Sequence, residues 1–88
     1  MIEVEVMITN KLGLHARPAA KLVQTASNFI SSIVLIKENL EVNAKSIMGV
    51  MMLAAEMGSK IVIRVDGSDE NEALKAVAQV FNSKFGEE

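Results

Sequence analysis

The segment GLHARPAA (residues 13–20) separates two hydrophobic periods of the chain. Before it, apolar side chains occupy alternate positions along residues 2–8, which is the period of a half-buried strand. After it, apolar residues recur at positions 19, 22, 23, 26, 29 and 30, close to the spacing of a helix packed on one face. Pro18 fits only the first turn of a helix, where its missing N–H has no intrahelical partner. We therefore expect a strand, a loop and a helix that opens beside His15.

The rest of the chain predicts a small α+β fold with the order β-α-β-β-α-β-α. Two serines, Ser31 and Ser32, are expected to close the first helix. The later predicted segments are a hairpin of strands 33–36 and 40–42, a helix from Ser46 to Gly58, a strand at 60–65, and a helix from a capping box of Asp69 and Glu72 to Phe85, with Gly86 after its end. Such connections favour an antiparallel or mixed four-stranded sheet with helices on one face, and they leave the strand order open.

Length and composition limit the function classes. The 88 residues suffice for one domain, which we expect to span 1–88. A formal net charge of −2 and few aromatic residues argue against nucleic-acid binding, which calls for excess Lys and Arg or for stacking platforms. The chain has no cysteine and a single histidine, so neither a disulfide framework nor a zinc site is expected. We expect no metal and no cofactor.

No segment predicts membrane insertion. The first residues, MIEVE, lack the basic segment and the continuous apolar run of a signal peptide. The longest apolar run, residues 47–55, is far shorter than the roughly 20 residues that cross a bilayer. We therefore expect a cytoplasmic protein.

The main clue to function is that several groups able to bind or transfer an anion are clustered around His15. At a helix start, the free N–H groups of Ala16 and Arg17 and the positive end of the helix dipole form an anion site. Imidazole is mostly neutral at pH 7, so its nitrogen can take up a phosphoryl group and release it. The guanidinium of Arg17 presents a planar fork of donors to phosphate oxygens. A capping or surface histidine without chemistry is the alternative reading of the same residue.

Two motifs give the chain a family resemblance. The segment GLHARPA (residues 13–19) resembles the active-site motif of the HPr family, the histidine-containing phosphocarriers of the bacterial phosphoenolpyruvate:sugar phosphotransferase system. The segment KSIMGVM (residues 45–51) resembles the second, regulatory motif of that family. The likeness extends over essentially the whole chain, with both motifs in register.

The resemblance implies a fold and a mechanism. HPr-like proteins are open-faced β-sandwiches with a four-stranded antiparallel sheet and three helices on one face. By resemblance, His15 accepts a phosphoryl group on Nδ1 from the phosphohistidine of Enzyme I and passes it to sugar-specific IIA components. Arg17 and the backbone N–H of Ala16 would stabilise the phosphate during this transfer. We expect a monomer with small, transient interfaces.

The second motif suggests regulation and a docking surface. Ser46 is a plausible N-cap, and its resemblance to the regulatory serine of Gram-positive HPr implies phosphorylation by HPr kinase/phosphorylase. Phosphate there would block the upstream donor and favour a catabolite-control transcription regulator. The helix after Ser46 has almost no polar face, so it is either fully buried or partly exposed as a contact surface. The expected contact residues are Ala16, Ala20, Ile47, Met48 and Met51.

Three other functions compete with the phosphocarrier. A regulatory module of similar βαββαβ order would hold an anion at the helix start without covalent chemistry. An acylphosphatase-type hydrolase would pair an arginine with an asparagine, whereas here a histidine adjoins Arg17. An HPr-like regulator without a transport role would lack the histidine. The chain departs from the common family pattern at Leu12 and Ala54, and Glu88 is either a carboxylate near the site or part of a solvated acidic tail.

Overall fold

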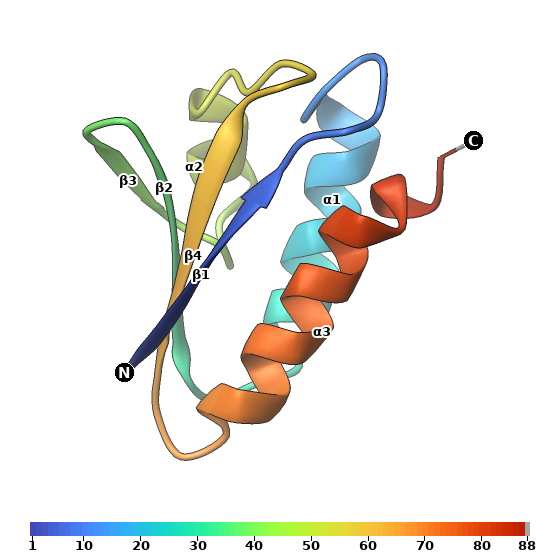
Figure 1. Cartoon of the computed structure of the whole chain (residues 1–88). Helices are drawn as coiled ribbons and strands as arrows, with labels where there is room; N and C mark the ends of the chain where they lie inside the picture. Colours follow the sequence, from blue (N-terminus) through green and yellow to red (C-terminus); the bar gives the residue numbers. More distant parts are fainter. Residues whose placement is uncertain (88) are drawn as a thin grey trace.

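A computed structural model of the chain describes residues 1–87 (Figure 1). The elements are β1 (Ile2–Met7), α1 (Ala16–Ala26), β2 (Ser32–Lys37), β3 (Leu40–Asn43), α2 (Ile47–Met52), β4 (Lys60–Asp66), α3 (Glu70–Asn82) and a 3₁₀ turn, η1 (Lys84–Gly86). Among the described residues, no helix combines the length and the apolar character that crossing a bilayer requires.

The sheet has the strand order β1-β4-β2-β3, and every neighbouring pair is antiparallel. Among the strands of residues 1–87, only β2 and β3 are joined by a hairpin, with Glu38 at a φ of 57° in its turn. The last strand, β4, lies between β1 and β2, because α1 carries the chain from β1 past one strand position to β2, and the segment containing α2 then leads from β3 back to that position. Figure 1 shows α1 and α3 side by side on that face, with α2 at one end. The antiparallel sheet with helices on one side is thus confirmed, and the strand order is now defined.

An aliphatic core lies between the sheet and the helices. The strands direct alternate residues into it, as in β4, where Ile61, Ile63 and Val65 are fully buried while Val62 and Arg64 lie on the opposite face. The two phenylalanines at the end of α3, Phe81 and Phe85, pack edge to face with ring centroids 5.0 Å apart.

All three helices end earlier than the sequence predicts. The first, α1, ends at Ala26 with Ser27 as its C-cap, so Phe29 and Ile30 lie outside it and the Ile30 side chain is 79% exposed. The second, α2, is only six residues long, and the prediction that it continues to Gly58 is wrong. The third, α3, ends at Asn82, so Phe85 lies in η1 and not in the helix.

The early end of α2 has a tertiary cause. Leu53 and Ala55 are buried in the core, and the backbone between them turns through Ala54 at a φ of 49°. A continuous helix would leave these two side chains on different sides, so burying both requires the left-handed turn despite its cost at a non-glycine residue. The family departure at Ala54 falls on this turn.

The predicted capping box of α3 is also wrong. Asp69 is the N-cap, but its side chain makes no cap hydrogen bond. Instead, its carboxylate accepts hydrogen bonds from the backbone N–H groups of Ile30 and Ser31, each at 3.0 Å, and from the Ser31 hydroxyl. Asp69 therefore ties the start of α3 to the loop between α1 and β2.

Candidate functional site

His15 is the N-cap of α1, at the end of the loop that follows β1. Its carbonyl accepts the first helical hydrogen bond, from Ala19 N at 2.9 Å. Its side chain makes no capping hydrogen bond and is 36% exposed. The imidazole is therefore not used to cap the helix, and part of the ring faces solvent.

The loop before His15 is pinned to the segment after α2. Gly13 has a φ of +69°, and a Cβ built there would lie 2.4 Å from the carbonyl oxygen of Ala55. Next to it, Leu14 N donates a hydrogen bond to that same oxygen at 2.9 Å. Because only glycine tolerates both this backbone angle and this approach, Gly13 sets the entry of the chain into α1.

The start of α1 offers unpaired donors. Among residues 1–87, neither Ala16 N nor Arg17 N donates a hydrogen bond, and Pro18 has no N–H. The first turn of α1 contains no acidic residue. Within the same described part of the chain, the exposed guanidinium of Arg17 pairs with no acceptor. These groups leave a positive end of a helix open to an anion beside His15.

Two residues that the sequence analysis did not predict, Glu87 and Asn10, lie on the Nε2 side of His15. The Oε2 atom of Glu87 lies 3.0 Å from His15 Nε2, and its Oε1 accepts a hydrogen bond from Asn10 Nδ2 at 3.0 Å. Nε2 is buried and has no aligned hydrogen-bond partner among the described residues, so its contact with Glu87 is electrostatic in this geometry. The expected carboxylate at Glu88 lies outside the described residues.

No pattern in the sequence points to this contact. Asn10 and Glu87 are 77 positions apart, and the turn that places Glu87, η1, interrupts what the sequence predicts as a continuous helix. The loop before the motif does contain an asparagine, but that Asn10 is fully buried and therefore needs partners is known only from the structure.

Ser46 is the N-cap of α2. Its hydroxyl accepts a hydrogen bond from Gly49 N at 3.1 Å, which satisfies one of the free donors of the helix. The preceding Lys45 is directed elsewhere, with Nζ donating to the Phe29 carbonyl at 2.6 Å. Ser46 itself is half-buried, at the edge of the surface that α2 presents.

An exposed apolar surface follows Ser46. On α2, Met48 is 76% exposed, Met52 67%, and Ile47 and Met51 slightly over 40% each. Leu12, in the loop before His15, is 76% exposed. Of the two alanines expected beside them, Ala16 is exposed and Ala20 is half-buried. Figure 1 shows α2 and the start of α1 at the same end of the molecule, and α1 contacts α2, so the exposed residues of α2 and His15, the N-cap of α1, belong to this end.

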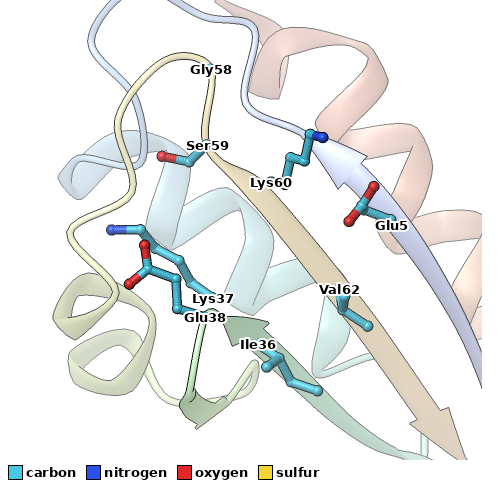
Figure 2. Close-up of a pocket in the computed structure, with 8 residues that line it drawn as sticks. All are labelled: Glu5, Ile36, Lys37, Glu38, Gly58, Ser59, Lys60 and Val62. Atoms are coloured by element: carbon cyan, nitrogen blue, oxygen red, sulfur yellow. The ribbon is translucent and has the colours of Figure 1, made fainter.

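A hollow of about 400 Å³ lies on the face of the sheet that the helices leave uncovered (Figure 2). Its lining residues are Glu5, Ile36, Lys37, Glu38, Gly58, Ser59, Lys60 and Val62. None of the predicted site residues is among them, and charges of both signs surround a floor of Ile36 and Val62. The hollow is therefore separate from the His15 site. Elsewhere in residues 1–87, no three His, Asp or Glu side chains are grouped as a metal would require.

Comparison with known proteins assigns this arrangement to a family. A family model described as the PTS HPr component phosphorylation site matches residues 2–83. The chain belongs to the HPr family. It is 54% identical over 88 residues to phosphocarrier protein HPr of Xylella fastidiosa, covering all of this chain and 99% of that protein.

Solved HPr structures agree with the fold. The crystal structure of HPr-C-His from Thermoanaerobacter tengcongensis has a TM-score of 0.96 and 55% identity, and the match covers 100% of this chain and 99% of that one. A crystal structure of an HPr dimer from the same organism has a TM-score of 0.80 and 54% identity, with 99% of this chain and 100% of that one covered. The chain is accordingly an HPr phosphocarrier of the phosphotransferase system, a system whose HPr proteins work with Enzyme I and IIA components.

Proposed function

We propose that His15 carries a phosphoryl group from phosphorylated Enzyme I to the sugar-specific IIA components. The observation that carries this proposal is the ring at the start of α1, partly exposed and beside unpaired donors of Ala16 and Arg17. Because Nε2 is buried, the exposed part of the ring belongs to its other atoms, and Nδ1 is the nitrogen available to a donor. These donors would stabilise a phosphate bound to His15, whereas a histidine that only caps the helix would not need them.

The transfer needs little covalent chemistry from the protein. The electron pair of Nδ1 forms the new N–P bond while the P–N bond to the donor histidine breaks and leaves its electron pair on the donor nitrogen. In the loose transition state of phosphoryl transfer, charge is spread over the equatorial oxygens. Arg17 and the N–H groups at the start of α1 would stabilise that charge, and the reverse steps would deliver the phosphoryl group to a IIA component.

The direct test is labelling with Enzyme I and ³²P-phosphoenolpyruvate. Wild type is expected to gain one acid-labile label, and His15→Ala to gain none while its circular dichroism stays unchanged. Arg17→Ala should slow labelling about a hundredfold, because removing one donor aimed at the transferring group typically costs that much. Lys11→Ala is the matched control, since it removes an exposed cation from the loop before His15. Label on His15→Ala would refute the assignment.

Ser46 is proposed as a regulatory phosphorylation site for HPr kinase/phosphorylase. A phosphate on its hydroxyl would add about −1.5 to −2 charges at the start of α2, where the helix end tolerates them. It would also stand beside the exposed Ile47 and Met48, which we propose as part of the surface that docks Enzyme I. Binding of the donor would weaken, and a catabolite-control transcription regulator that recognises the phosphate would be favoured.

A charge-mimicking pair tests the regulatory proposal. Ser46→Asp should lower the rate of phosphate uptake from Enzyme I, whereas Ser68→Asp should not. Ser68 is exposed and directly precedes the N-cap of α3, so it places the same charge at the start of a different helix. Equal rates for the two variants and wild type would count against a blocking role of Ser46.

The proposed docking surface consists of Ala16, Ala20, Ile47, Met48 and Met51. Methionine side chains adapt to differently shaped partners, which suits a carrier that meets both a donor and several acceptors. We propose that residues 1–88 act as one domain and as a monomer in the cytoplasm, since a carrier must expose His15 to each partner in turn. Light scattering at working concentration tests the monomer, and a stable dimer would contradict it.

A further inference from the structure

The carboxylate of Glu87 is held in place and is not a free tail group. The 3₁₀ turn η1 buries Phe85 against Phe81, and the Glu87 backbone N–H then donates to Lys84 O at 3.0 Å. With this geometry the Glu87 side chain lies beside His15 at the start of α1. Only 20% of the Glu87 side chain remains exposed.

Asn10 braces this carboxylate from the loop side. It is fully buried, and its Nδ2 donates both to Gly13 O at 2.8 Å and to Glu87 Oε1 at 3.0 Å. Its Oδ1 is buried with no partner among the described residues, which is costly for stability. An apolar side chain at position 10 would avoid that cost. The amide of Asn10 is explained by its two hydrogen bonds, which hold Gly13 O and Glu87 Oε1 in place.

We propose that Glu87, braced by Asn10, determines which imidazole nitrogen of His15 takes the phosphoryl group. This inference rests on the proposed function of His15 as phosphoryl carrier. The carboxylate covers Nε2 at 3.0 Å, fills the approach to that nitrogen and repels an anion there. With Nε2 covered in this way, the electron pair used for the new N–P bond is that of Nδ1. Glu87 is thus a positioning residue for the transfer.

A carboxylate is the only side-chain group of this size that suits both neighbours. Glu87 Oε1 accepts a hydrogen bond from Asn10 Nδ2, and a carboxylate places a second negatively charged oxygen, Oε2, beside His15 Nε2. A glutamine has one oxygen and one NH₂ group, so it can accept at only one end. Glu87→Gln therefore keeps a side chain of the same shape over Nε2 but loses the negative charge and one of the two acceptor oxygens. Glu87→Ala removes the side chain from Nε2 altogether.

The experiment uses a small donor that has no docking surface. The full chain is incubated with phosphoramidate, which gives up its phosphoryl group with release of ammonia, and NMR of phosphohistidine measures the ratio of Nε2 to Nδ1 product. Wild type should yield the Nδ1 product. Glu87→Ala should raise the ratio about tenfold, the factor that loss of a charge-assisted contact typically gives. Glu87→Gln should give a ratio between the two.

Glu72→Ala is the matched control, because it removes an exposed glutamate from the first turn of α3, at the opposite end of that helix from η1. It should leave the ratio at the wild-type value. A Glu87→Ala ratio equal to wild type would overturn the proposal, as would a Glu87→Gln ratio above that of Glu87→Ala. Since phosphoramidate replaces Enzyme I, this result is separate from the labelling test. A wild-type protein that Enzyme I fails to label would refute the carrier function and would leave the measured nitrogen preference standing.

Discussion

Replacing two glycines by alanine separates the backbone strain at Gly13 from its close contact. Gly13 and Gly58 both have positive φ angles, +69° and +92°. A Cβ at Gly13 would lie 2.4 Å from Ala55 O and 3.0 Å from the Glu56 Cα, whereas a Cβ at Gly58 would meet nothing within 4 Å. Gly58→Ala therefore measures the cost of a positive φ at alanine alone. Gly13→Ala measures that cost together with the steric clash between the new Cβ and Ala55 O.

The expected losses follow from these contacts. Alanine in the left-handed region costs about 1–2 kcal/mol, partly offset by about 0.5–1 kcal/mol from the stiffer unfolded chain. Gly58→Ala should thus lower the free energy of unfolding by about 1 kcal/mol. At Gly13 the Ala55 carbonyl must also move, which breaks its hydrogen bond with Leu14 N and costs about 2 kcal/mol more. Gly13→Ala should then lose about 3 kcal/mol in all.

Urea unfolding followed by far-UV circular dichroism is the suitable assay, because the chain has no Trp or Tyr for fluorescence. With a slope of about 1 kcal/mol/M for a protein of this size, the midpoints of the two variants should differ by about 2 M. Gly13→Ala should also slow labelling by Enzyme I, because the collision displaces the loop that ends at His15. Equal stability losses in the two variants would refute the reasoning that the Gly13 contact with Ala55 fixes the start of α1.

Three further predictions concern stability. Ala54→Gly should raise the free energy of unfolding by about 0.5–1 kcal/mol. Ala54 has a φ of 49°, and removing its backbone strain gains more than the extra chain entropy of glycine costs. A lower melting temperature would contradict this. Ser46→Ala should lose about 1 kcal/mol in the same urea assay, since Gly49 N would lose its cap, and an unchanged midpoint would disprove the capping role. The hydrogen bond from the Ser31 hydroxyl, followed by the backbone N–H groups of Ile30 and Ser31, lowers the pKa of Asp69 from its ordinary value of 3.8. The stability that the Asp69 carboxylate contributes is therefore present above pH 3.8 and is lost as the pH falls through its lower folded-state pKa. Asp69→Asn should remove this dependence and flatten the acid side of a plot of unfolding free energy against pH. An unchanged plot would exclude this contribution.

The sequence predicts an element well when its apolar residues recur at the same spacing as the positions that face the core. In β1 and β4, alternate residues face the core, and the period of two in the sequence reports this directly. Pro18 locates the start of α1 for a similarly local reason, because its ring and missing N–H suit only a first turn. The hairpin turn at residues 38–39 likewise depends on neighbouring residues alone.

Local pattern fails where a distant contact competes with propensity. The apolar run after Met52 reads as helix, yet burial of Leu53 and Ala55 under the sheet ends α2 and forces Ala54 into the left-handed region. Asp69 reads as half of a capping box, yet it bonds to the loop at Ser31. In both cases the competing partner is far along the chain, so no window of neighbouring residues contains it.

The amino-acid order alone carries the family, the order of strands and helices, and the grouping of His15 with Arg17, because motifs and hydrophobic periods are properties of adjacent residues. Only the tertiary structure decided the place of β4 between β1 and β2, the length of α2, and the position of the Glu87 carboxylate beside His15 Nε2. These features depend on which surfaces meet when the chain closes on itself, and that is set by the packing of the whole core and by the turn at η1.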